Sequence, residues 1–408
     1  MIRVLYVIHY PVFGGPHNQA LRLAKPLAER GFDTVAVVPD EAGNAVERLR
    51  AGGVDVRSIR LHRLRATRDL RAHFGLAVNA PAEIARLRAL IRSEGISIVQ
   101  LGGLVNPHAA IAARLERVPV VWQLLDTRAP RLVAATAMAF VRTLADVVMS
   151  TGLGVAKAHP GYSAIADRVI PYFPPVDLGR FAPNPELRIA ARDSWGVSSD
   201  DLVVGCVANI NPQKGIVGLV RAFQLARMRI QGRKVVLVLV GAEYPQHAGY
   251  SAMVRRQIQA EGLVEAQDVI FVGGSTDVES QLAGMDVFAL AAVPRSEGVT
   301  TALLEAMAAG LPSVVTDVGA LREVVEHGRT GFVFQADDTI GFGLALAGLL
   351  NDPERLSSMG QAARLVAQAS FGLGSCVDVH VRAYIRALAT RGTTSRTSPT
   401  PTRSGRPR

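Results

Sequence analysis

Residues 296–310 read Ser-Glu-Gly-Val-Thr-Thr-Ala-Leu-Leu-Glu-Ala-Met-Ala-Ala-Gly. They follow an apolar run at 287–290 that is typical of a buried strand. The stretch itself predicts a loop around Glu297 and then a helix that begins near Thr300 and stops at Gly310. A strand, a loop and a helix in this order form the repeating unit of a parallel sheet covered by helices. Ligands bind such a sheet beyond the carboxyl ends of its strands, so the stretch predicts both the fold class and the place of a site.

The rest of the chain repeats this unit in both halves. Apolar runs alternate with helical patterns, which predicts βαβ units with parallel strands. We therefore expect an α/β fold of two tandem doubly wound, Rossmann-like domains that face a central cleft. The predicted strands cover residues 4–8, 34–38, 54–59, 96–101, 118–124 and 146–150 in the first half, and 202–208, 234–240, 269–272, 287–290 and 313–316 in the second.

The domain boundary is expected where prolines interrupt the pattern. Pro171, Pro174 and Pro175 lie close together, and such a run cannot continue a helix or a central strand. The end of the chain is rich in Thr, Ser, Pro and Arg and lacks apolar periodicity, which predicts disorder. The predicted parts are an N-terminal domain at 1–172, a C-terminal domain at 173–370, a C-terminal helix at 371–390 and a disordered tail at 391–408.

The positive charge of the chain is unevenly distributed. The net charge of +10 divides into +9 for residues 1–175, −4 for residues 176–390 and +5 for the tail. A basic first domain can contact an anionic membrane surface or a phosphorylated or acidic acceptor, and residues 60–73 are its densest basic run. A solvated, arginine-rich surface is the simpler interpretation of that run. Aromatic residues total only 5%, which disfavours base stacking, so we expect no nucleic-acid partner.

Cysteine content and hydropathy limit the cellular context. Cys206 and Cys376 are too few for a disulfide framework or a Cys-rich zinc site, and Cys206 lies in an apolar run typical of a core. The first apolar run is too short for a signal peptide, and no run approaches the ~18 residues of a membrane span. We therefore expect a cytoplasmic protein that can lie at the cytoplasmic face of the membrane.

The predicted helix after Glu297 has the features of an anion site. Its start offers free backbone N–H groups and the positive end of the helix dipole, and Gly298 lets the backbone approach a phosphate closely. Glu305 lies about one turn into the helix, where a carboxylate can accept hydrogen bonds from both hydroxyls of a ribose. Glu297 can hold hydroxyls of a sugar attached to that phosphate. The alternative is a surface helix with two solvated glutamates, which the order of strand, glycine loop, helix start and acid disfavours.

Two further loops follow predicted strands. Residues 204–215 place Lys214 at a helix start, where a lysine can neutralise a diphosphate leaving group without a metal ion. The chain has only four lysines, which favours a function over a chance surface position. Gly14 and Gly15 predict a turn whose backbone can reach a phosphate or sugar across the cleft, although glycine pairs mark turns in many proteins.

Together these segments resemble the retaining GT-B glycosyltransferases of family 4, the glycosyl transferases group 1. That family carries a Glu-x7-Glu element, matched here by Glu297 and Glu305, inside a pattern similar to Glu-Gly…Leu-Leu-Glu-Ala-Met-Ala-x-Gly-x-Pro. It also carries a Lys-Gly after the first strand of its second domain, matched by Lys214, and a linker similar to Pro-Pro-Val-Asp…Phe at 174–181. The similarity extends over residues 3–390 and is more specific in the second domain.

The resemblance implies a metal-independent hexosyltransferase that moves a sugar from a nucleotide-diphosphate donor to a glycan, lipid-linked or small-molecule acceptor with retention of configuration. The C-terminal domain would bind the donor and the N-terminal domain the acceptor, and the last helix would cross back onto the first domain. No cofactor and no metal are expected, because the nucleotide sugar is a substrate. The implied catalytic residues are Glu297, Lys214 and Asp126, and the implied donor-binding residues are Gly15, Asn209, Lys214, Glu297, Gly298, Val299, Thr300, Thr301 and Glu305.

Two positions depart from the family pattern. The arginine that usually pairs with the diphosphate is replaced by Asn209, and a histidine of many members is replaced by Leu125. The cleft is then expected to use Asp126 or another group. These departures leave two alternative functions open, a degenerate transferase that serves as a nucleotide-sugar-binding partner subunit and a GT-B-type sugar-nucleotide epimerase. The histidines that could substitute, each more commonly structural, are His9, His17 and His108.

Motifs of other enzyme classes are missing from the sequence. It contains no Asp-x-Asp, which the metal-diphosphate site of the other large glycosyltransferase architecture uses. It also lacks a Gly-x-Gly-x-x-Gly after a strand, a P-loop and a Gly-x-Ser-x-Gly elbow, which disfavours a dehydrogenase, a P-loop enzyme and an α/β hydrolase.

Overall fold

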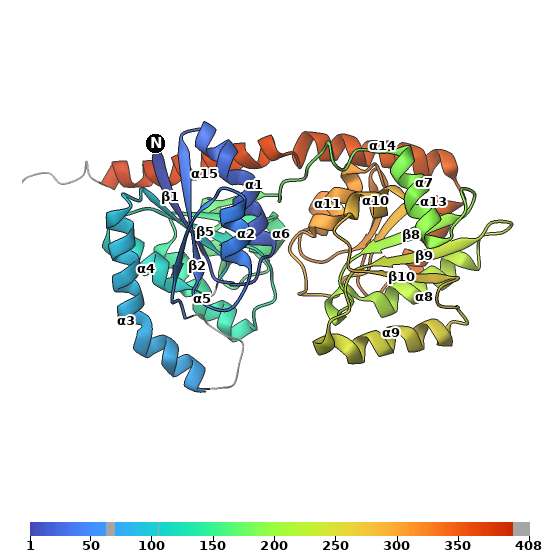
Figure 1. The fold of residues 1–408 in the computed structure, drawn as a ribbon, viewed down its shortest axis with the longest axis horizontal. Helices are drawn as coiled ribbons and strands as arrows, with labels where there is room; N and C mark the ends of the chain where they lie inside the picture. Colours follow the sequence, from blue (N-terminus) through green and yellow to red (C-terminus); the bar gives the residue numbers. More distant parts are fainter. Residues whose placement is uncertain (63–69, 105, 395–408) are drawn as a thin grey trace, which may run out of the picture.

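The chain forms two α/β units that lie side by side and are bridged by helices along one edge (Figure 1). The computed structural model describes residues 1–62, 70–104 and 106–394. Residues 63–69, which are half of the basic run at 60–73, and the tail from residue 395 onwards lie outside the described residues.

The first unit is built on a seven-stranded parallel sheet with the order β3-β2-β1-β4-β5-β6-β7. The strand order reverses between β1 and β4, as in a Rossmann-type sheet. Its strands are β1 (Ile2–Ile8), β2 (Phe32–Pro39), β3 (Asp55–Ile59), β4 (Ile98–Gly102), β5 (Val120–Leu124), β6 (Val147–Thr151) and β7 (Val169–Tyr172). Its helices are α1 (Gly15–Glu29), α2 (Ala45–Ala51), α3 (Leu70–Ser93), α4 (Pro107–Leu115), α5 (Arg131–Leu144) and α6 (Leu153–Lys157).

The second unit repeats the plan with six parallel strands in the order β10-β9-β8-β11-β12-β13. The expected fold class, two doubly wound Rossmann-like domains, is therefore confirmed. Its strands are β8 (Leu202–Val207), β9 (Val235–Val240), β10 (Val269–Gly273), β11 (Val287–Leu290), β12 (Ser313–Thr316) and β13 (Gly331–Phe334). Its helices are α7 (Pro185–Trp195), α8 (Ile216–Arg227), α9 (Ala248–Ala260), α10 (Val278–Ala283), α11 (Thr301–Ala308), α12 (Leu321–Val324) and α13 (Thr339–Leu350).

Two long helices at the end of the chain span both units. α14 (Pro353–Ser370) packs on α11 and α13 of the second unit, and α15 (Leu373–Thr394) packs on α1 and on β4 to β7 of the first (Figure 1). Tyr384 and Val377 of α15 are buried in the same cluster as Val4 of β1. The described helix continues to Thr394, whereas the tail was expected to begin at residue 391.

The sequence prediction missed the last strand of each sheet. β7 and β13 are edge strands that pair on one side only, and each is four residues long. β7 contains Pro171, which was taken to end the regular structure of the first domain. A proline is tolerated there because the side of an edge strand that lacks a neighbour does not need its N–H.

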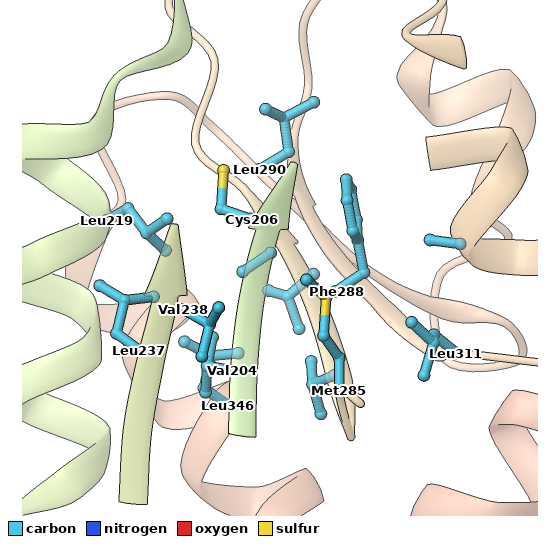
Figure 2. Close-up of a cluster of buried hydrophobic side chains, with 14 of the residues drawn as sticks. Val204, Cys206, Leu219, Leu237, Val238, Met285, Phe288, Leu290, Leu311 and Leu346 are labelled. Atoms are coloured by element: carbon cyan, nitrogen blue, oxygen red, sulfur yellow. The ribbon is translucent and has the colours of Figure 1, made fainter. Parts of the chain in front are cut away.

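Continuous apolar runs became the buried central strands of both sheets. Figure 2 shows part of the second core, where Cys206 of β8 lies beside Leu290, and Met285 and Phe288 lie on the other side of the strand. A Cβ at Gly205 would lie 1.9 Å from the Met285 sulfur, so a larger residue at position 205 would force Met285 to move. Burial raises the pKa of the Cys206 thiol to about 12, and the predicted role of Cys206 as a core residue is confirmed.

Within the described residues, no helix has both the length and the apolar character needed to cross a bilayer.

Candidate functional site

A cavity opens between the two units at the carboxyl ends of their strands. Its first wall comes from the loop after β1, from one face of α1 and from the loop after β5, and its second wall from the loop after β11. The linker at 174–175 closes one end. This is where a doubly wound sheet places its ligand. The lining residues used below are Gly14, Gly15, Gln19, Arg22, Leu125, Asp126, Arg128, Thr151, Glu297, Gly298, Val299 and Thr301.

Lys214 and Glu297, predicted separately from two loops, form an ion pair in this region. The Lys214 Nζ lies 2.7 Å from Oε1 of Glu297, and the two side chains are 14% and 6% exposed. The second carboxylate oxygen of Glu297 accepts a hydrogen bond of 3.2 Å from the Thr300 hydroxyl. A cation and an anion are thus held together in a nearly buried setting. Removing either side chain would leave the other as a nearly buried charge without a partner.

The backbone around Lys214 explains why the two loops meet. Residues 212–214 form one turn of 3-10 helix, and Gly215 follows with a φ of +62°. A Cβ at Gly215 would lie 1.8 Å from the Ala291 carbonyl oxygen, so the turn packs directly on the chain after β11. The Val293 N–H also donates to the Gln213 carbonyl over 3.0 Å. Glycine at position 215 is therefore required both by its conformation and by the close approach.

Glu305 points from α11 into a partly buried setting between cations. Burial raises the pKa of the Glu305 carboxyl, while the positive charges of Arg22 and Arg180 act in the opposite direction. Arg180 itself pairs with Glu279 of α10. α11 begins after Thr300, whose extended backbone leaves the first N–H groups of the helix facing the loop at 297–299. The arrangement offers a helix N-terminus and a carboxylate to the same ligand.

The Glu297 loop also touches the opposite wall of the cleft. A Cβ at Gly298 would lie 2.2 Å from the Leu125 carbonyl oxygen and 2.7 Å from Oγ1 of Thr151. The Thr151 hydroxyl donates to that Leu125 carbonyl over 2.8 Å. Glycine at position 298 thus lets the second unit contact the ends of β5 and β6, a need that the sequence alone did not reveal.

The predicted glycine turn at the start of α1 is fixed by a histidine. Nδ1 of His17 accepts a hydrogen bond of 3.1 Å from the Gly14 N–H, and Nε2 donates to the Tyr10 carbonyl over 2.9 Å. The pKa of His17 is lowered by burial, which favours the neutral form that both bonds need. His17 therefore positions the loop that carries Gly15, and its ring has no nitrogen left for a substrate.

The other two candidate histidines do not line the cleft cavity. His108 of α4 bonds to the buried Glu83 carboxylate, with 2.9 Å between Nδ1 and the oxygen. His9 is buried near Gly103. Neither residue is among those that line the cavity.

Asp126 and Asn209 lie in different places relative to the cavity. Asp126 was expected to act where Leu125 replaces the family histidine, and Asn209 replaces the family arginine. Asp126 lines the cavity beside Leu125, and its carboxylate accepts a hydrogen bond of 3.0 Å from the Arg128 N–H. Asn209 lies outside the residues that line the cavity, and its side-chain oxygen accepts a hydrogen bond of 3.1 Å from the Ala242 N–H. Asn209 thus ties the end of β8 to the loop after β9.

Cations from the first unit were missed by the sequence analysis. Arg22 and Arg128 both line the cavity, and Arg22 also donates to the Pro175 carbonyl over 2.9 Å. The helical spacing of the sequence was a signal for Arg22, because Gly15, Gln19 and Arg22 are four and three residues apart and therefore lie on one face of α1. In the part of the chain that the structure describes, no three His, Cys, Asp or Glu residues gather closely enough to hold a metal ion.

Comparisons with known proteins match both units. Residues 14–170 match the glycosyl transferase 4-like domain, and residues 188–366 match glycosyl transferases group 1. The chain is 30% identical to a GDP-mannose-dependent alpha-(1-6)-phosphatidylinositol monomannoside mannosyltransferase of Mycolicibacterium smegmatis, over 71% of this chain and 76% of that protein. It is 30% identical to a D-inositol 3-phosphate glycosyltransferase of Gordonia bronchialis, over 64% of this chain and 57% of that protein.

Solved structures show the same fold at lower identity. Anabaena Alr3699/HepE in complex with UDP superposes with a TM-score of 0.78 at 19% identity and covers 93% of this chain and 99% of that one. WaaG, a glycosyltransferase involved in lipopolysaccharide biosynthesis, gives a TM-score of 0.63 at 17% identity over 94% of this chain and 99% of that one.

Proposed function

Because the chain belongs to the family 4 glycosyltransferases of the GT-B type, we propose that its donor is GDP-mannose and that its acceptor carries a phosphorylated or lipid-linked headgroup. The chain is a glycosyltransferase that moves a sugar from a nucleotide-diphosphate donor to an acceptor, the activity of its relatives. The choice of donor and acceptor is supported by the mannosyltransferase relative, which matches over both units.

The ion pair of Lys214 and Glu297 is the observation that carries the assignment of roles. Lys214 lies where it can leave Glu297 and neutralise the charge that develops on a departing diphosphate. Glu297 then turns to the hydroxyls of the transferred sugar. The N–H groups from Gly298 to Thr301 hold the distal phosphate, and Glu305 holds the ribose hydroxyls.

The acceptor is assigned to the first wall of the cleft. Arg22 and Arg128 give that wall positive charge, and Asp126 supplies a carboxylate beside it. Cations in a partly enclosed cavity favour an acceptor that bears phosphate. The excess of positive charge over residues 1–175 further supports a location of this unit at an anionic membrane surface.

Donor binding is tested by thermal unfolding in the presence of GDP-mannose, UDP-glucose and UDP-N-acetylglucosamine. A ligand at about 100 times its Kd stabilises the folded state by about 2.7 kcal/mol, which raises Tm by several degrees. We expect GDP-mannose to give the largest rise. A rise with a UDP-sugar alone would contradict the proposed donor and leave the transferase activity standing.

Transfer is then measured with a phosphoinositol lipid in vesicles and with free inositol phosphate as acceptors. Labelled sugar in either product supports the proposed acceptor class. Donor binding without transfer to any acceptor points to a degenerate transferase, and an epimerised donor in the absence of acceptor points to an epimerase.

Removal of divalent metal ions is expected to leave transfer unchanged. Lys214 and the N-terminus of α11 supply positive charge where a metal would otherwise neutralise the diphosphate. Initial rates before and after treatment with EDTA should agree within twofold. A large loss that added magnesium or manganese restores would contradict this expectation.

A further inference from the structure

The loop that carries Glu297 is clamped to the first unit by two reciprocal contacts. Nε of Arg128, in the first unit, donates to the Ser296 carbonyl over 3.1 Å. In return, Nη2 of Arg295 donates to the Ala129 carbonyl over 3.0 Å. Arg295 has a φ of +63°, a strained conformation for a residue with a side chain. Such strain at this point indicates that the path of the loop is set by its contacts.

A second segment joins the same loop to the first unit from the other side. The Ala320 N–H donates to the Gly298 carbonyl over 3.1 Å, and Ala320 is buried in the hydrophobic cluster of the first unit. Gly152, at the end of β6, has a φ of +86°, and a Cβ there would lie 2.2 Å from the Cβ of Ala320. The segment at 318–320 is thus wedged between the Glu297 loop and the first unit.

Glu323 fastens this wedge with its carboxylate. Oε2 accepts a hydrogen bond of 2.7 Å from the Leu153 N–H, and Oε1 accepts one from the Gly154 N–H. These two N–H groups belong to the first turn of α6 in the first unit, where they have no partner within the helix. A carboxylate is favoured at that position because hydrogen bonds from N–H groups to a charged acceptor are stronger than those to a neutral one.

We propose that Glu323 is a positioning residue that couples closure of the two domains to the placement of Glu297. When its carboxylate engages α6, the Ala320 wedge holds the Gly298 carbonyl, and the loop brings Glu297 against Lys214. When the domains separate, the loop loses its contact with Arg128, and the wedge loses its contacts with Gly152 and α6. This inference rests on the proposed role of Glu297 in sugar transfer.

Nucleotide binding and sugar transfer should depend differently on the Glu323 contacts. Glu305 and the N-terminus of α11 belong to the second domain alone, so a nucleoside diphosphate can bind without closure. The sugar-facing loop is completed by the first domain. Loss of the Glu323 contacts should therefore lower kcat and leave the affinity for the nucleotide intact.

The test compares Glu323→Gln with Glu326→Gln in the full-length protein. Glutamine keeps the size of the side chain, but its amide group can accept only one of the two N–H bonds. Glu326 lies three residues further along the chain and pairs with Arg329 of its own unit, so its replacement removes the same charge and breaks a contact within the second unit. For this solvent-exposed contact we expect kcat of Glu323→Gln to fall by about tenfold, and kcat of Glu326→Gln to stay within twofold.

Two further measurements make the test specific. The Kd of GDP by calorimetry should be unchanged in Glu323→Gln, or the Kd of UDP if UDP-sugars prove to be the donors. Small-angle X-ray scattering in the presence of the nucleotide should give a larger radius of gyration for Glu323→Gln than for wild type. Ala320→Leu, which enlarges the wedge, should likewise lower kcat and increase the radius of gyration.

An unchanged kcat and radius of gyration in Glu323→Gln would overturn the proposal. So would an equal loss in Glu326→Gln, or a loss of nucleotide affinity that matches the loss of kcat. If wild type transfers no sugar, the proposed function fails, and the scattering comparison still decides whether Glu323 holds the domains together.

Discussion

Replacing Lys214 with methionine is expected to lower kcat for sugar transfer by about 10²–10³-fold, the usual effect of removing one preorganised group that stabilises a developing negative charge. Lys214 provides the cation of the Lys214–Glu297 pair, and the neutral side chain of Asn209 cannot provide a second charge. The variant should bind nucleotide with a smaller loss, because Glu305 and α11 remain. Steady-state kinetics with saturating donor measure the first effect, and calorimetry with the nucleotide measures the second.

The same substitution is expected to destabilise the fold, because Glu297 is left nearly buried without its cation. The loss in free energy of unfolding should be about 1–3 kcal/mol. In the double variant Lys214→Met with Glu297→Gln, the charge is gone from both sides, so stability should recover while activity does not. Recovery of activity in the double variant would contradict a catalytic role for the pair.

Lys234→Met is the matched control for this experiment. Lys234 is exposed and precedes β9, at the edge of the sheet opposite to the cleft. Its replacement removes the same charge from the same domain and should change kcat by less than twofold. An equal loss in both variants would show that net charge, not position, explains the result.

The sequence was most informative where structure is local. Continuous apolar runs indicated the central strands of both sheets, because a strand covered on both faces needs no polar alternation. β7 and β13 were missed because they are short edge strands, and Pro171 resembles a break when its neighbours in space are unknown. Glycine and proline patterns report the local backbone, not the position of a strand in the sheet.

Single residues at this edge of the sheet could be predicted from the sequence, but their arrangement could not. The order of strand, loop and helix placed Glu297 and Lys214 at the same edge of the sheet, and the structure brings them to 2.7 Å. No local pattern indicated that they pair with each other. Contacts between the domains, such as those of Arg128 and Glu323, depend on how two separately folded units meet, and a single sequence contains no periodicity that reports this.

The histidines show the same limit. His17 was named as a residue that could substitute for the missing family histidine, with a structural role as the more common expectation. Its two nitrogens are used instead to hold the Gly14 N–H and the Tyr10 carbonyl. The role of such a residue depends on which backbone groups the turn leaves without partners, and this becomes visible only when the turn is built.

Replacing Glu305 with glutamine is expected to weaken nucleotide binding by roughly 10- to 100-fold, the effect of losing charge-assisted hydrogen bonds to two ribose hydroxyls. Calorimetry with the nucleoside diphosphate measures this change directly. Glu354→Gln, on the exposed first turn of α14, is the control and should leave Kd unchanged. A Glu305→Gln variant that binds as tightly as wild type would exclude the ribose role.

The pH dependence of nucleotide affinity, compared between wild type and Glu305→Gln, provides an independent check. Burial raises the pKa of the Glu305 carboxyl in the free wild-type protein. The ionised form accepts both hydroxyls, so the affinity of wild type for the nucleotide should fall as the pH drops through that raised pKa, and Glu305→Gln should lack this fall.

The contribution of Glu305 to folding stability changes with pH in the opposite direction. The folded protein binds the Glu305 proton more tightly than the unfolded chain does, so this carboxyl adds to the stability of the free protein as the pH falls. The difference in Tm between wild type and Glu305→Gln, measured without nucleotide from pH 7 to about pH 5, should therefore shift in favour of wild type while its advantage in nucleotide affinity shrinks. Parallel changes in the two quantities would show that another group controls the titration.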